Sequence, residues 1–80
     1  VQNNFRIYPN PVEHNLFLKR NFEFAQSNVL QLVSSDGQLI FEKEVFSNLE
    51  LIDFSSMSSG TYFLKVIRNG KTETHKIIKK

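Results

Sequence analysis

Apolar and polar residues alternate along most of this chain, in short runs separated by turn residues. Successive side chains of a strand point to opposite faces, so this period of two is typical of strands with one buried face. Helical spacing fits poorly, and only residues 20–26 could form a short helical turn. We therefore expect seven strands: residues 5–8, 15–19, 28–33, 38–45 and 48–53, then one strand on each side of Asn69-Gly70.

The dipeptide Asn69-Gly70 predicts a tight hairpin near the C-terminus. Both central residues of a type I′ turn need positive φ, which Asn and Gly tolerate best. A two-residue loop also fixes the register, and it places Tyr62 opposite Ile77 and Leu64 opposite His75. The outer face of this hairpin then carries apolar residues among lysines and threonines, which could mark a docking surface: Phe63, Ile67 and Ile78 with Lys65, Thr72, Thr74 and Lys76.

Seven short strands with regularly spaced turns indicate an all-β fold. An immunoglobulin-like β-sandwich of antiparallel strands fits the length best, and an open barrel is the alternative. Tyr62 follows Gly60 by two residues at a strand start, where it is expected either to form a tyrosine corner or simply to fill the core. The alternation predicts a core between two sheets made of Leu16, Leu18, Leu30, Leu32, Ile40, Ile52, Tyr62, Leu64 and Val66.

The composition is that of one small folded domain. The chain has 80 residues, of which 40% are hydrophobic, and it has no cysteine for a disulfide or thiolate site. No apolar run is long enough to span a bilayer, and no signal peptide begins the chain. The missing initiator Met suggests a piece of a longer protein. We expect residues 1–4 to be a linker remnant, residues 5–80 to form the domain, and the domain to be a monomer.

Charge is divided unevenly along the chain. Residues 1–60 carry four basic and seven acidic residues, whereas residues 61–80 carry six basic and one acidic. Lysines on an exposed edge strand discourage pairing with other chains, so edge protection and recognition by a partner both explain the basic end. Nucleic acid is not expected as a partner, because Tyr62 and Phe63 are adjacent and point to opposite faces.

Catalytic and metal-binding patterns are absent from the sequence. No Gly-x-Ser-x-Gly elbow is present, and His14 and His75 lack the spacing of a helical zinc site. Asp53 is expected to bond nearby backbone at a strand end, and Asp36 belongs to a turn with Gly37. We expect no enzyme activity, no cofactor and no metal.

Four motifs, in order, resemble a known family. They are Tyr8-Pro9-Asn10-Pro11, Leu30–Leu32 leading to Gly37, residues 52–62 with Asp53, Gly60 and Tyr62, and Lys76-Ile77-Ile78-Lys79-Lys80. This pattern resembles the type A C-terminal sorting domain of the type IX (Por) secretion system. Two positions depart mildly from it, because Ser34 stands where Asp is frequent and Met57 stands where Leu is usual.

The resemblance implies that this domain is the C-terminal module of a larger exported protein. It implies that a covalently linked upstream cargo passes through the periplasm to the cell surface or the medium. The outer-membrane translocon would recognise the domain, and a sortase-like peptidase would then remove it. An immunoglobulin-like accessory module that stays on a secreted protein, as a spacer or binding unit, is the alternative.

The motifs also have physical explanations. Pro9 and Pro11 stiffen a segment suited to a chain that switches between sheets, and Gly60 is expected where a Cβ would be obstructed. We interpret these two motifs as structural. The last five residues are expected to be a free terminal strand that the translocon reads: Lys76, Ile77, Ile78, Lys79 and Lys80.

Overall fold

The computed structural model describes residues 6–19, 28–45, 49–68 and 70–80, so the helical turn considered for residues 20–26 lies outside the described residues. The described part contains the seven expected strands. They are β1 (Arg6–Tyr8), β2 (Asn15–Lys19), β3 (Asn28–Ser34), β4 (Leu39–Val45), β5 (Leu49–Asp53), β6 (Gly60–Arg68) and β7 (Lys71–Lys79).

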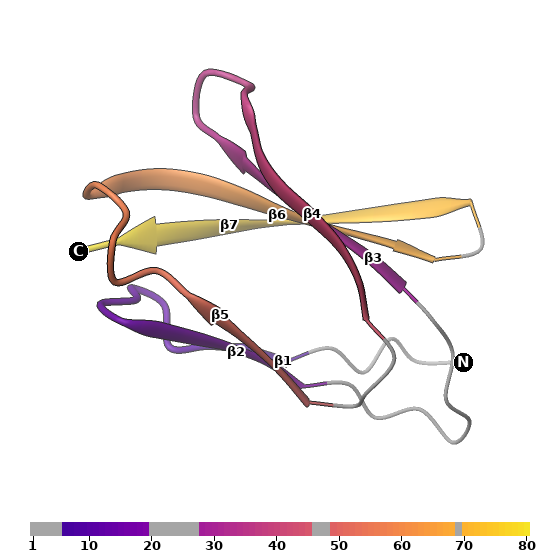
Figure 1. Ribbon diagram of the computed structural model, residues 1–80, viewed down its shortest axis with the longest axis horizontal. Coiled ribbons are helices and arrows are strands. Elements are labelled where there is room, and N and C mark those ends of the chain that lie inside the picture. Colours follow the sequence, from indigo (N-terminus) through magenta and orange to yellow (C-terminus); the bar gives the residue numbers. More distant parts are fainter. Residues whose placement is uncertain (1–5, 20–27, 46–48, 69) are drawn as a thin grey trace.

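The strands form two antiparallel sheets that pack as a sandwich (Figure 1). One sheet has three strands in the order β1-β2-β5, and the other has four in the order β4-β3-β6-β7. In β2, β3 and β6 every second residue is buried, as the alternating sequence predicts. The β-sandwich prediction is confirmed.

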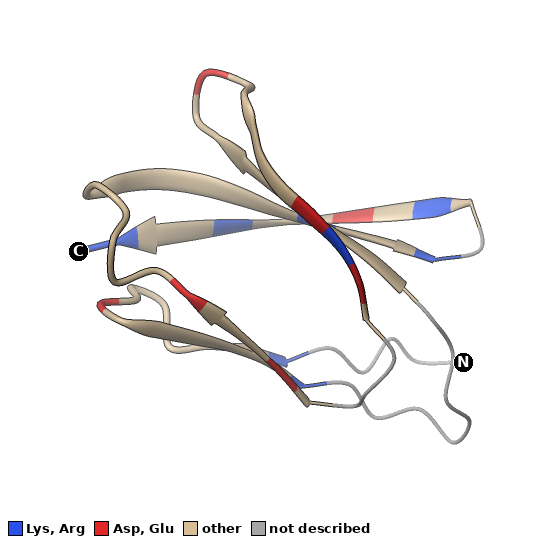
Figure 2. Cartoon of the chain, viewed as in Figure 1, with Lys and Arg blue, Asp and Glu red and all other residues tan. Residues whose placement is uncertain are grey.

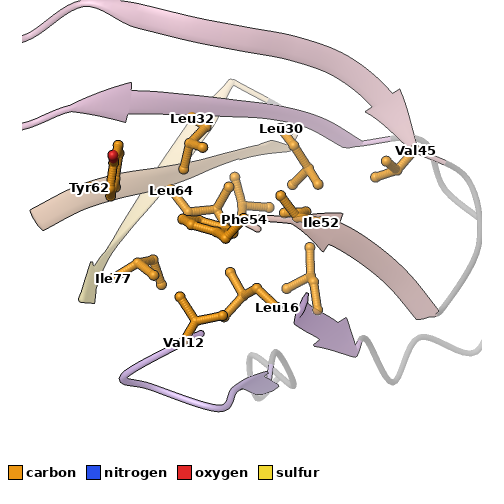
Figure 3. Close-up of a cluster of buried hydrophobic side chains, with 12 residues drawn as sticks. Val12, Leu16, Leu30, Leu32, Val45, Ile52, Phe54, Tyr62, Leu64 and Ile77 are labelled. Carbon is orange, nitrogen blue, oxygen red and sulfur yellow. The ribbon is translucent and has the colours of Figure 1, made fainter. Parts of the chain in front are cut away.

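The core fills the space between the sheets (Figure 3). Eight of the nine residues expected there are buried, and Leu16, Leu30, Leu32 and Leu64 are completely inaccessible to solvent. The structure adds four buried residues that the alternation did not single out: Val12, Val45, Phe54 and Ile77.

Ile40 is the exception, because 41% of its surface is exposed. Leu32 pairs with Phe41 but its neighbour Val33 pairs with Leu39, so Ile40 is the extra residue of a β-bulge. One extra residue reverses the facing of the side chains on either side of it. Phe41 therefore packs against the core, and the core assignment of Ile40 was wrong.

The C-terminal hairpin has the expected register. Tyr62 pairs with Ile77, and the ladder continues to Arg68 and Lys71, which leaves a two-residue loop. Asn69 lies outside the described residues, but Gly70 has a φ of 75°, as the second position of a type I′ turn requires.

Tyr62 forms the expected tyrosine corner at the crossover from β5 to β6. Its hydroxyl donates a 2.6 Å hydrogen bond to the carbonyl oxygen of Ser58, and its ring meets Phe54 edge to face at 5.7 Å. A turn in which Met57 N–H bonds to the Phe54 carbonyl occupies this connection. Met57 packs its side chain on the core, so it serves there as Leu would.

Gly60 is required for a different reason from the one expected. A Cβ at this position would meet no atom within 4 Å, so obstruction was the wrong explanation. Its φ is 148°, a conformation that side-chain-bearing residues rarely adopt. The backbone conformation at the start of β6 therefore favours glycine.

Candidate functional site

The C-terminal end of β7 carries the residues expected to be recognised, and the structure divides them by accessibility. Ile77 points into the core and is completely buried. Lys76 and Lys80 are exposed, whereas Ile78 and Lys79 are half-buried. A partner of the folded domain can therefore contact four of the five side chains, and Ile77 supports the fold.

The outer edge of this strand is not free, because residues 10–12 lie along it. The Asn10 side chain donates from Nδ2 to the Lys76 carbonyl and accepts through Oδ1 from the Ile78 N–H, both at 2.9 Å. Val12 N–H donates to the Ile78 carbonyl at 2.8 Å, and Lys80 N–H donates to the Val12 carbonyl at 2.9 Å. We call these four hydrogen bonds the terminal clamp.

Asparagine suits this position because its carboxamide has both a donor and an acceptor. It reproduces the hydrogen bonding of one strand residue, and Val12 continues the pattern with its own backbone as an isolated parallel bridge to Lys79. The backbone nitrogens of Pro9 and Pro11 cannot donate, and in the contact with β7 the Asn10 side chain supplies the donor. An amide residue between two prolines was the sequence signal for this contact, although its partner could not be read from it.

The clamp also explains how the chain changes sheets. β1 belongs to the three-stranded sheet, Val12 pairs with the edge of the four-stranded sheet, and β2 returns to the three-stranded sheet. The Tyr8–Pro9 and Asn10–Pro11 peptide bonds are both cis. The expectation of a sheet-switching segment is thus confirmed, but the expectation of a free terminal strand was wrong.

The remaining motif residues stabilise turns. The backbone N–H and the hydroxyl of Ser55 donate to Asp53 Oδ1 at 2.9 and 2.6 Å. These bonds hold the pKa of the Asp53 carboxyl below its ordinary value, with the hydroxyl as the larger cause. Asp53 therefore acts as the strand-end carboxylate that the sequence indicates.

The turn between β3 and β4 is organised by Ser34. Its hydroxyl accepts a hydrogen bond from Gln38 N–H at 3.1 Å and contacts the Asp36 carboxylate, which lowers the pKa of Asp36. Gly37, with a φ of 93°, donates its N–H to the Ser34 carbonyl at 3.0 Å. Ser34 thus makes the local turn bonds expected of it.

Basic residues mark the end of β7, and acidic residues mark the opposite edge of the same sheet (Figure 2). Lys76, Lys79 and Lys80 lie toward the C-terminus, whereas Glu42 and Glu44 lie on β4. Lys43 of β4 reaches across to the other sheet and pairs with Glu50 of β5 at 2.5 Å. The four-stranded sheet is therefore acidic at one edge and basic at the end of the other.

Neither histidine sits in a metal-ligand cluster within the part of the chain that the structure describes. There, no three His, Asp or Glu side chains gather closely enough to hold a metal ion. The His75 Nε2 lies 3.4 Å from Glu73 Oε1, and His14 contributes its backbone carbonyl to a bond from Phe54 N–H at 2.6 Å. Within the same described residues, no helix has the length and hydrophobicity to cross a bilayer.

Comparison with known proteins identifies the family of this domain. No curated protein matches the chain. A family model described as a secretion system C-terminal sorting domain matches residues 6–80, which include the clamp, both turns and the terminal strand. This family consists of secretion-signal domains and not of enzymes. The chain belongs to the C-terminal sorting domains of the Por (type IX) secretion system and directs secretion through that system.

Proposed function

We propose that the outer-membrane translocon of the type IX system recognises this domain, as a type A sorting domain, through the end of β7. The side chains that it reads are those of Lys76, Ile78, Lys79 and Lys80. A sortase-like peptidase then removes the domain, and the upstream cargo is released or attached at the cell surface. Membership of the family supports contact with the secretion machinery, and the end of β7 supplies a basic site for it.

The observation that carries this proposal is the terminal clamp. Chain termini are ordinarily the least ordered part of a domain unless they are tied down. Here four hydrogen bonds hold residues 76–80 against the body, while Lys76 and Lys80 remain exposed. Presenting charges on a fixed strand lowers the entropy lost when a partner binds them.

The proposal is tested by replacing Lys76, Lys79 and Lys80 with Gln in a reporter that carries an export signal and this domain. Backbone pairing is unchanged by these substitutions, and exposed charges contribute little to stability, so the variant is expected to unfold as the parent does. More of the reporter should stay in the periplasm. A matched control replaces three exposed basic residues elsewhere, Arg6, Lys19 and Lys71, with Gln and should export normally.

Two results would contradict the proposal. Equal surface delivery by the Gln variant and its parent would show that the lysines are not read. Reporter that reaches the surface or the medium with the domain still attached would show that no peptidase removes it.

A further inference from the structure

The outer face of the four-stranded sheet is unusually apolar beside the end of β7. Along β6 and β7, Phe63 lies opposite Lys76, and Thr61 lies opposite Ile78. Val33 of β3 is the partner of Phe63 on its other side. Phe63, Ile78 and Val33 are only half-buried, although a solvated face of an antiparallel sheet is ordinarily polar.

Two lysines accompany this apolar centre. Strand residues separated by two share a face, so Lys76 and Ile78 project from the same side of β7. Lys65 lies on this face of β6, one pleat from Phe63. We call Val33, Phe63 and Ile78, with Lys65 and Lys76, the outer patch.

The clamp restricts how a partner can approach. Edge strands commonly bind by accepting an added strand, which uses outward-pointing backbone groups. At the end of β7 these groups belong to Lys76, Ile78 and Lys80, and they are already bonded to Asn10 and Val12. Strand addition there would first have to break four hydrogen bonds, whereas docking on the face breaks none.

We infer that the secretion machinery docks face-on against the outer patch, through a protein surface that has an apolar centre and carboxylates around it. This inference rests on the proposed function and extends it from the terminal lysines to β3 and β6. The lysines call for negative partners, and Phe63 supplies the aromatic anchor that is frequent at the centre of interfaces. Glu42 and Glu44, on the far edge at β4, would repel the same carboxylates and so fix the orientation of the partner.

The first test changes the anchor. Phe63→Thr keeps a strand-forming residue and removes the ring, and export of the reporter should fall about five- to tenfold, as for loss of an interface anchor. Phe17→Thr is the matched control, because Phe17 is also a half-buried aromatic but faces outward from the other sheet beside Tyr8. Both variants are compared at equal folded fractions, measured by denaturant titration. Normal export by Phe63→Thr would overturn the inference.

The second test changes the sign of a charge. Lys65→Glu should reduce export more than Lys65→Gln, because facing carboxylates would repel the new charge. Lys19→Glu, on the outer face of the three-stranded sheet, should have no effect. Equal export by the Glu and Gln variants at position 65 would show that no carboxylate faces this residue.

The third test separates face docking from strand addition. Backbone groups alternate along an antiparallel strand, so the N–H of Thr74 points outward like that of Ile78. Thr74→Pro removes this donor and leaves the ladder to β6 in place, a change that edge strands tolerate. Face docking predicts normal export, and loss of export at an unchanged folded fraction would indicate strand addition instead.

Other occupants of the outer patch have their own signatures. Cosedimentation of the reporter fusion with phosphatidylglycerol vesicles, lost in Phe63→Thr, would assign the patch to a lipid surface. Dimerisation in sedimentation analysis, lost in the same variant, would assign it to a second copy. Either result would overturn the inference. If the parent fusion itself is not exported, the proposed function fails; if the parent is exported and Phe63→Thr is too, only the outer patch fails.

Discussion

The role of each side chain in this domain depends on which face of its strand it occupies. Leu32 is completely buried between the sheets, whereas its neighbour Gln31 points outward and donates to Glu42 Oε1 at 3.0 Å. Asp53 is exposed, but two bonds from Ser55 make it part of a turn. Single substitutions should therefore measure the contribution of core packing and the contribution of turn hydrogen bonds separately.

Leu32→Ala should lower the free energy of unfolding by about 2–5 kcal/mol, because it removes buried methyl groups and leaves a cavity. Gln31→Ala is the control and should cost about 1 kcal/mol or less, since only one exposed hydrogen bond is lost. Denaturant titration measures both. A loss below about half a kcal/mol for Leu32→Ala would mean that the site is not packed.

Asp53 should make stability depend on pH. A carboxyl whose pKa is lower in the folded state contributes stability above the pKa of the unfolded chain, and this contribution disappears as pH falls through the folded pKa. Unfolded Asp titrates near about pH 4, so the parent should lose stability below about pH 5. Asp53→Asn should lose less over the same range, and parallel curves from chemical unfolding would contradict this assignment.

At the scale of elements, the terminal clamp unites two motifs that lie at opposite ends of the sequence. Asn10 and Lys76 are 66 residues apart in sequence, yet one carboxamide joins them. The clamp also protects the C-terminal half of the outer edge of β7 from pairing with other chains, which the lysines alone were expected to do. The clamp therefore supplies edge protection along this half of the strand, which leaves the lysine side chains for the recognition that we propose.

Asn10→Asp should open the clamp while keeping the side-chain size. A carboxylate can still accept from Ile78 N–H but cannot donate to the Lys76 carbonyl, and the two oxygens repel. Stability should fall by about 1–3 kcal/mol, and amide exchange at Ile78 and Lys80 should accelerate. Thr72→Asp adds the same charge to β7 outside the clamp and should leave both amides protected. Unchanged exchange in Asn10→Asp would mean that the clamp does not hold the strand.

For the whole molecule, the alternating pattern was sufficient to predict the sandwich. The positions of the strands along the chain and the hairpin register followed from local signals, because the pattern and the two-residue turn depend on neighbours in sequence. The facing of Ile40 could not be predicted, since a single bulge reverses a strand and leaves no composition signal. The partner of Asn10 could not be predicted either, because the contact depends on how two distant segments are brought together by the fold.

Deleting residues 76–80 should destabilise the whole domain. The deletion removes Ile77 from the core and all four clamp bonds, a loss of more than about 3 kcal/mol. Small domains have only about 5–15 kcal/mol in total, so thermal unfolding should shift far downward and lose cooperativity. The variant with Gln at positions 76, 79 and 80 is the control and should melt like the parent. A deletion variant with an unchanged melting temperature would show that the domain is stable without residues 76–80.

The clamp also constrains when the domain can finish folding during synthesis. Synthesis runs from the N-terminus, so Asn10 is made before Ile78, and its carboxamide can bond to Ile78 only after β7 has been made. A chain that stops short of Ile77 has neither the finished core nor the positioned lysines. The basic strand that we propose the machinery reads is therefore held in position only after β7 has been synthesised and has closed against residues 10–12.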